Sequence, residues 1–117
     1  MTTSNPVATD QLPTTIRAYL SAHAAGDVDA ALRAFAPDAV VTDEGHTYRG
    51  TAEVLRFLRK AGSEFTYTTE LIGAERADDR HWVAIQRLEG DFPGGVVDLR
   101  FRFVMADGSI SELVIAP

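Results

Sequence analysis

The sequence contains no cysteine, so it can form neither a disulfide framework nor a thiolate site. This usage fits a reducing compartment, and we expect the protein to be cytoplasmic. The chain also lacks any run of about 18 apolar residues, the length that a membrane-spanning helix needs. Its first ten residues have no cationic region and no apolar core, unlike a signal peptide. We therefore expect no membrane partner.

An excess of positive charge is missing as well. Lysine and arginine number 11 against 17 aspartate and glutamate residues, which gives a formal net charge of -6. Nucleic-acid binding depends on cationic contacts to phosphate, so we expect no nucleic-acid partner. The 3 histidines are scattered without spaced carboxylate partners, and no glycine-rich phosphate loop occurs. The sequence therefore predicts no metal site and no bound cofactor.

The length and composition are those of one globular domain. The chain has 117 residues, of which 45% are hydrophobic. Residues 1–10 are expected to form a flexible polar tail, followed by a single domain over residues 11–117. Apolar residues in the first half recur with helical period, and the clearest face consists of Leu12, Ile16, Tyr19, Leu20 and His23. Gly26 is placed to end this helix, Asp27 to cap a second one, and Gly50 to begin a third.

The second half has the composition of strands. Four segments are rich in β-branched and aromatic residues and are separated by turn signals; they cover residues 65–74, 81–89, 96–105 and 110–115. Asp107-Gly108 suits a two-residue hairpin turn, which would place Met105 opposite Ile110 and Phe103 opposite Glu112. Helices followed by antiparallel strands indicate an α+β fold, with three helices packed on a curved, mostly antiparallel sheet.

Several short motifs point to one family. They are Gly26-Asp27 between the first two helices, Phe35 to Ala39 leading into a strand, Tyr48-Arg49-Gly50 before the third helix, and the closing segment FVMADGSISELVI. Through them the chain resembles the SnoaL-like branch of the nuclear transport factor 2-like (NTF2-like) superfamily, to which ketosteroid isomerases belong. The resemblance implies a cone-shaped α+β barrel with a cavity between sheet and helices, and a homodimer formed through the sheet. Members include polyketide cyclases, epoxide hydrolases and binding proteins without chemistry, so the site needs its own argument.

Asp43 is the first candidate for that site. It ends the short apolar run Ala39 to Val41, and the resemblance implies that a carboxylate here is a general base that moves a proton beside a carbonyl. Such a base needs an apolar cavity, because desolvation raises the pKa of a carboxylate. The alternative is an ordinary turn residue followed by Glu44-Gly45.

Tyr19 is the second candidate. It matches the tyrosine that donates a hydrogen bond to an oxyanion in the isomerases; the alternative is that it is a core aromatic residue.

The second acid of the isomerases has no match in this sequence. Its place, counted back from Asp107-Gly108, falls on Arg100, with Asp98 on the same face two residues earlier. Arginine cannot act as a neutral acid, but it can bind an oxyanion, and Asp98 would orient the Arg100 side chain. Such an aspartate–arginine pair is similar to the catalytic groups of the epoxide hydrolases. By pattern alone, the face with Phe101 and Phe103 is the better core face. The resemblance instead implies that the charged face points toward the cavity, and we favour that register. A single β-bulge would exchange the two faces.

Apolar and aromatic residues are available to line a pocket for a ring-shaped ligand. We expect its wall to be built from Phe35, Tyr48, Phe57, Trp82 and Leu113, with Tyr67 as a further aromatic candidate.

Three functions then compete. The first is cofactor-free acid–base catalysis, of isomerase, cyclase or epoxide-hydrolase type, on a small apolar cyclic or polyketide-like substrate; its residues are Asp43, Tyr19, Arg100 and Asp98. The second is a non-catalytic module that binds a small apolar molecule in the same cavity. The third is a dimerising scaffold whose own side chains fill the cavity.

Overall fold

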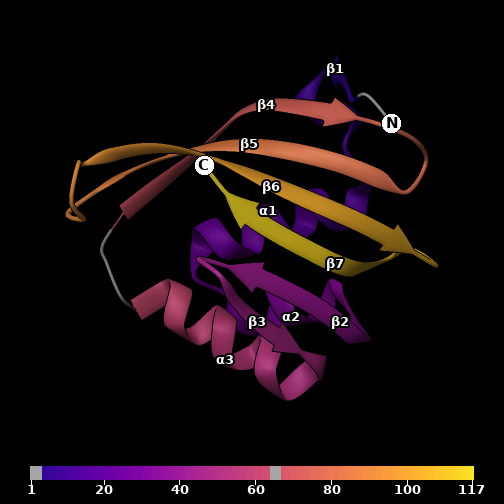
Figure 1. The fold of residues 1–117 in the computed structure, drawn as a ribbon, viewed down its shortest axis with the longest axis horizontal. Coiled ribbons are helices and arrows are strands. Elements are labelled where there is room, and N and C mark those ends of the chain that lie inside the picture. Colours follow the sequence, from indigo (N-terminus) through magenta and orange to yellow (C-terminus); the bar gives the residue numbers. More distant parts are fainter. Residues whose placement is uncertain (1–3, 64–66) are drawn as a thin grey trace.

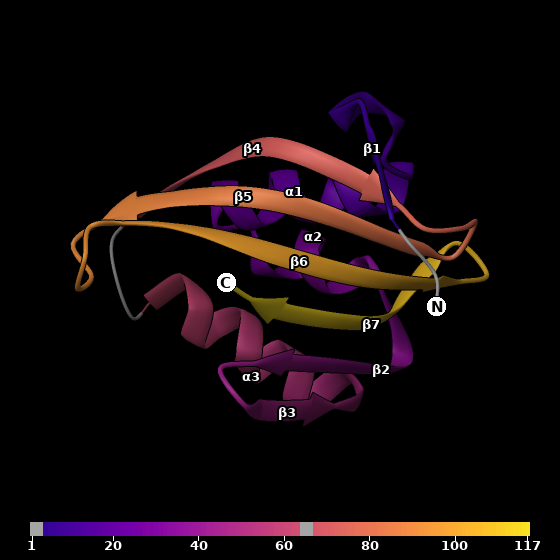
Figure 2. The ribbon, with the colours of Figure 1, turned by 45° about the horizontal axis from the view of Figure 1, so that its top comes forward.

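The computed structural model of the chain describes residues 4–63 and 67–117. Its strands are Asn5–Val7 (β1), Phe35–Asp43 (β2), His46–Arg49 (β3), Tyr67–Arg76 (β4), His81–Gly90 (β5), Val96–Ala106 (β6) and Ser109–Ala116 (β7). They form one sheet in the order β1-β4-β5-β6-β7-β2-β3. Neighbouring strands are antiparallel except for the parallel pair of β2 and β7. The sheet is curved and not closed, as Figures 1 and 2 show.

The three helices lie where the sequence predicts, except that α1 begins at Thr14, so Leu12 of the predicted helical face lies before the helix. They are α1 (Thr14–Ala25), α2 (Val28–Arg33) and α3 (Gly50–Ser63), and a short 3-10 turn, η1, covers Thr9–Gln11. Gly26 ends α1 in the left-handed conformation, with φ of 72°, which costs glycine no steric strain. The Asp27 side chain caps α2 by accepting a hydrogen bond from the Ala30 N–H at 3.1 Å. Among the described residues, no helix is long and apolar enough to cross a membrane.

The helices cover one face of the sheet, here called the inner face, and the core lies between them. Cross-strand neighbours on this face are Tyr48, Val41, Leu113, Phe103 and Trp82, taken in order from β3 through β2, β7 and β6 to β5. Leu113 and Phe103 are almost fully buried there, and the Tyr19 ring of α1 lies 5.9 Å from that of Phe103. The α+β fold predicted from the sequence is therefore confirmed, with the correction that the sheet stays open at both edges.

The register of the last hairpin differs from the prediction by one residue. Met105 does lie opposite Ile110, but a bulge follows, and Phe103 then lies opposite Leu113 rather than Glu112. Without the bulge, Glu112 would enter the core and Leu113 would face outward. Exposing a leucine side chain alone costs roughly 1.5–3 kcal/mol. The core therefore selects the bulged register, because one residue of slip would exchange the two faces of β7.

Part of the expected N-terminal tail is ordered. Asn5–Val7 pair with β4, and the Ser4 hydroxyl donates a hydrogen bond to Glu75 at 2.6 Å. These contacts cover what would otherwise be an exposed sheet edge. The predicted strand 65–74 corresponds to β4; residues 65 and 66, where we expected it to begin, lie outside the described residues.

Candidate functional site

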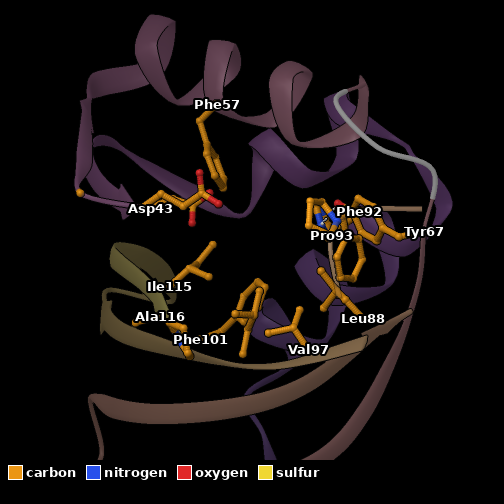
Figure 3. Close-up of a pocket in the computed structure, with 15 residues that line it drawn as sticks. Asp43, Phe57, Tyr67, Leu88, Phe92, Pro93, Val97, Phe101, Ile115 and Ala116 are labelled. Carbon is orange, nitrogen blue, oxygen red and sulfur yellow. Dashed lines mark hydrogen bonds between the residues drawn. The ribbon is translucent and has the colours of Figure 1, made fainter. Parts of the chain in front are cut away.

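A cavity of about 610 Å³ opens between the inner face of the sheet, the end of α1 and the helix α3. Most of its wall is apolar and comes from β5, β6, β7 and the loop between β5 and β6. Figure 3 shows the side chains around it. The lining residues are His23, Asp43, Glu44, Gly45, Phe57, Tyr67, Leu88, Phe92, Pro93, Val97, Leu99, Phe101, Ile115, Ala116 and Pro117. The size suits a ring compound of ordinary metabolite size.

Asp43 lies at one side of this cavity, where β2 ends. It is paired with Ile115 of β7 and with His46 of β3, so two neighbouring strands fix its backbone. Glu44 and Gly45 form the tight turn that follows, with φ of 51° and 79°. The turn residues are therefore the two after Asp43, and the Asp43 carboxylate points into the cavity between Phe57 and Ile115, as Figure 3 shows.

Tyr67 and His23 form a polar pair on the other side of the cavity. The Tyr67 hydroxyl lies 3.3 Å from Nε2 of His23, and both residues line the cavity. Burial raises the pKa of Tyr67, and the negative charge of Asp43 raises it further. Burial lowers the pKa of His23, so at neutral pH the imidazole is uncharged. In Figure 3, Tyr67 and Asp43 face the same space from opposite sides.

Tyr19 lies behind this pair, in the core. Its side chain is 0% exposed, and its hydroxyl has no hydrogen-bond partner among the described residues. The ring stacks on His23 with centroids 5.8 Å apart and meets Phe35 edge-on at 5.3 Å. Burial raises the pKa of Tyr19, with smaller contributions from Tyr67 and Asp43. Tyr19 is therefore an inward-facing residue of α1, as predicted, but it is not among the residues that line the cavity.

A second buried polar group lies next to a residue of the cavity wall. Gln86 of β5 is 3% exposed and lies opposite Leu99, a lining residue, on the inner face. Its Nε2 has no hydrogen-bond partner in the described part of the chain.

Arg100 and Asp98 are not in the cavity, and the expectation that they line it is wrong. Both side chains belong to the outer face of β6, because the inner face carries Phe101 and Phe103. Arg100 donates a hydrogen bond to Glu75 at 2.6 Å and thereby lowers the pKa of that carboxyl. The face that the hydrophobic pattern favours therefore packs inward, as the transfer of aromatic surface from water requires.

Asp98 does not orient Arg100 either. It accepts two hydrogen bonds from Arg87 of β5, from Nε at 2.8 Å and from Nη2 at 3.1 Å. This bidentate pair lowers the pKa of Asp98 and is exposed on the sheet surface. The two charged residues therefore have separate partners on the outer face.

Of the five expected wall residues Phe57 lines the cavity, as does the further aromatic candidate Tyr67. The other four pack elsewhere: Phe35 and Leu113 are buried in the core, Tyr48 is half-buried with its ring 5.4 Å from Phe57, and Trp82 packs beside the core with its indole N–H donating to Asp79.

The wall residues missed from the sequence left two signals. Alternation of Val97, Leu99 and Phe101 along β6 marks them as one face, and this face is the one that meets the cavity. His23 occupies the same helical face as Tyr19, four residues later. The loop residues Phe92 and Pro93 had no such pattern.

The wall has three residues of types that bind metal ions, namely Asp43, Glu44 and His23. Among the described residues, however, no three His, Asp or Glu side chains are grouped to hold a metal ion. No lysine or arginine is found among the described lining residues. Asp43 and Tyr67 instead place a carboxylate and a hydroxyl across an apolar space, which suits hydrogen bonding and proton transfer to a bound molecule.

Comparison with known proteins shows the family of the chain. The model of the SnoaL-like domain matches residues 16–113, so the chain belongs to the SnoaL-like domain family. A proposed polyketide cyclase from Sinorhizobium meliloti is 33% identical over 94% of this chain and 100% of its own, with a TM-score of 0.87. No protein of curated function matches the sequence at a significant level.

More distant structures share the fold. A proposed polyketide cyclase from Xanthomonas campestris pv. campestris has a TM-score of 0.70 at 24% identity, over 86% of this chain and 85% of its own. A protein from Catenulispora acidiphila with a ketosteroid isomerase-like fold, solved with trimethylamine, has a TM-score of 0.78 at 16% identity, over 90% and 85% of the two chains.

Proposed function

We propose that the chain binds a small, largely apolar ring compound in this cavity and moves a proton on it, with Asp43 as the general base. The observation that carries the proposal is the position of Asp43: its carboxylate enters a cavity of about 610 Å³ whose wall is mostly apolar. A carboxylate directed into such a space, across from a hydroxyl, is the pattern of a site that transfers protons rather than of a turn.

The chemistry follows from the two sides of the cavity. A carbonyl compound bound between them would lose a proton from the carbon beside its carbonyl to the Asp43 carboxylate. The electron pair left behind forms an enolate, and its oxygen takes a hydrogen bond from a tyrosine hydroxyl. The carboxylic acid thus formed at Asp43 then returns the proton to carbon. The raised pKa of Tyr67 suits it to this step, because its hydroxyl stays protonated and remains a donor.

The ligand class follows from the wall and from the relatives. Rings such as Phe57 and Phe101 suit a flat or cyclic molecule, and two structural relatives are themselves proposed polyketide cyclases. We therefore propose a cyclic or polyketide-like carbonyl compound as the substrate.

Binding of a bicyclic ketone tests the proposal first. We expect 2-tetralone to raise the thermal midpoint of the wild type by mass action, and the shift to depend on Asp43 when Asp43→Asn is compared. Asp38→Asn is the matched control, because Asp38 is an exposed residue of the same strand. Equal shifts in all three proteins would mean that Asp43 does not contribute to ketone binding. The absence of any shift with a series of ring ketones would argue against the cavity as a ketone site.

A binding role without chemistry is the second candidate, and one observation favours it. Two of the four residues expected to catalyse lie on the outer face of the sheet, where Asp98 is paired with Arg87 and Arg100 with Glu75. Of those four residues, Asp43 alone lines the cavity, and a cavity with one of the expected catalytic groups can serve for recognition alone. Under this role Asp43→Asn changes affinity, and no proton exchange is catalysed. The cavity argues against the third hypothesis, in which side chains fill the space.

We also propose that two copies pair through the outer face of the sheet. The helices pack on the inner face, and the outer face carries Val83, Val104 and Val114 among charges of both signs such as Arg102 and Glu112. A two-fold arrangement can match opposite charges around an apolar centre. Light scattering should report a dimer for the wild type and a monomer for Val104→Glu; a monomeric wild type at high protein concentration would refute the pairing.

A further inference from the structure

Two tyrosines lie on this side of the molecule at different depths, and the geometry separates the roles of their hydroxyls. Tyr67 lines the cavity, whereas Tyr19 is fully buried behind His23 and does not line it. The hydroxyl within reach of a bound molecule is therefore that of Tyr67. Its contact with Nε2 of His23, at 3.3 Å, then decides where the phenol proton points.

Two arrangements are compatible with this contact. A neutral imidazole carries its proton on one ring nitrogen only. If the proton is on Nδ1, the Tyr67 hydroxyl donates to the bare Nε2, and its proton is directed at His23. If the proton is on Nε2, the imidazole N–H donates to the Tyr67 oxygen instead, and the phenol proton is directed away from His23.

The charge across the cavity favours the second arrangement. Asp43 lies on the opposite side from Tyr67, as Figure 3 shows, and its carboxylate is the acidic group whose charge acts on the Tyr67 hydroxyl. A hydroxyl dipole in the field of a carboxylate turns its proton toward the negative charge and its lone pairs away from it. The lone pairs of Tyr67 then face His23, which must supply a proton on Nε2 to complete the contact. A hydroxyl that accepts a hydrogen bond also becomes a better donor.

We propose that His23 is held as the Nε2–H tautomer, donates to the Tyr67 oxygen, and thereby directs the phenol proton into the cavity toward an oxygen atom of the bound compound. Tyr67 is then the group that recognises the ligand oxygen, and His23 is a positioning residue that acts through it. The ligand part of this inference rests on the proposed function, whereas the tautomer of His23 is a property of the protein alone.

The tautomer is measured directly on the full chain. Long-range proton–nitrogen NMR correlation at slightly alkaline pH distinguishes Nε2–H from Nδ1–H imidazole, and the signals of His23 are those missing in His23→Gln. We expect the Nε2–H pattern. An Nδ1–H pattern would overturn the proposal, because the Tyr67 proton would then be donated to His23. This result does not depend on any ligand, so it stands whether or not the proposed function does.

The role in recognition is tested with two probes of the same skeleton, 2-tetralone and tetralin. The wild type should prefer the ketone, and Tyr67→Phe should reduce that preference by roughly tenfold, as expected for one lost hydrogen bond. His23→Leu should reduce it similarly, and His23→Gln should retain most of it because an amide N–H can replace Nε2–H. Tyr48→Phe is the control, since Tyr48 is outside the cavity wall.

The failures of the two ideas can be told apart. An unchanged preference in Tyr67→Phe, with binding intact, would refute the role of the Tyr67 hydroxyl. Absence of binding by both compounds would count against the proposed function, and the tautomer would still decide how His23 and Tyr67 are arranged.

Discussion

Replacing Tyr19 by phenylalanine should stabilise the ligand-free protein. The side chain is 0% exposed, and its hydroxyl has no hydrogen-bond partner among the described residues. A buried polar group without a partner costs about 1–3 kcal/mol relative to an apolar group of the same shape. Tyr19→Phe removes the oxygen and keeps the ring contacts with Phe35 and His23, so most of this cost should be recovered. Because Tyr19 does not line the cavity, affinity for a ring ketone should be unchanged.

The size of the shift can be estimated from chain length. Unfolding entropy is about 2.1 cal/mol/K per residue, which for 117 residues amounts to about 0.25 kcal/mol/K. One kcal/mol therefore corresponds to about 4 °C, and Tyr19→Phe should raise the midpoint by roughly 4 to 12 °C. Tyr67→Phe is the matched comparison. Its hydroxyl contacts His23 at 3.3 Å, so its removal should lower the midpoint by a few degrees.

Calorimetry and urea denaturation of the wild type and the two variants measure these effects. A lower or unchanged midpoint for Tyr19→Phe would refute the reasoning, because it would mean that the hydroxyl is already satisfied in the folded protein. A loss of ketone affinity in Tyr19→Phe would show in addition that this hydroxyl, and not that of Tyr67 alone, reaches the ligand.

Three further outcomes follow from the described contacts. Asp98→Asn and Arg100→Gln should leave ligand affinity unchanged, since each residue is paired with another charged side chain on the outer face. A clear loss of affinity in titration calorimetry would show that the residue contributes to the binding site. Burial lowers the pKa of His23, so its contribution to stability is present above the unfolded-state value of about 6.5 and is lost as the pH falls through the folded-state pKa. As the pH is lowered across that range, the denaturant midpoint should fall less in His23→Gln than in the wild type or in His46→Gln. An equal fall in all three proteins would contradict this. Gln86→Met should raise the free energy of unfolding by about 1 kcal/mol because Nε2 lacks a partner in the described chain, and a lower denaturant midpoint would show that the amide is satisfied.

The end of α1 and the start of α2 were predictable because local chemistry determines them, whereas the short strands β1 and β3 were not predicted. Gly26 and Asp27 act within a few residues of their own positions, one through its left-handed conformation and the other through its capping carboxylate. The Asp107-Gly108 turn is equally local. These signals require no knowledge of the rest of the chain.

The faces of β6 and β7 were harder to assign, because the bulge between Ile110 and Glu112 is determined by the whole core. The hydrophobic pattern of β6 alone already favoured Phe101 and Phe103 as core residues, and that interpretation was correct. The resemblance to the isomerases turned the charged face inward and was wrong at this strand. Burial of aromatic surface outweighs a motif match when the two compete for one face.

The site was predictable where one element supplies the residue and its direction. Asp43 ends a strand, and the strand aims it. The pairing of Tyr67 with His23 was not predictable, since the two come from β4 and α1 and lie 44 residues apart in the chain. No local pattern encodes such a contact; it arises when the sheet folds over the end of the helix.

The central claim is that Asp43 removes a proton from a bound carbonyl compound. The direct measurement is exchange of the protons beside the carbonyl of 2-tetralone in deuterated buffer, followed by NMR with wild type, Asp43→Asn and the control Asp38→Asn. General-base catalysis by a positioned side chain contributes about 100- to 10,000-fold. The account predicts exchange well above the buffer rate for the wild type and Asp38→Asn, and a rate near that of buffer for Asp43→Asn. Exchange that is no faster with the wild type than in buffer, or that is equally fast with Asp43→Asn, would contradict it.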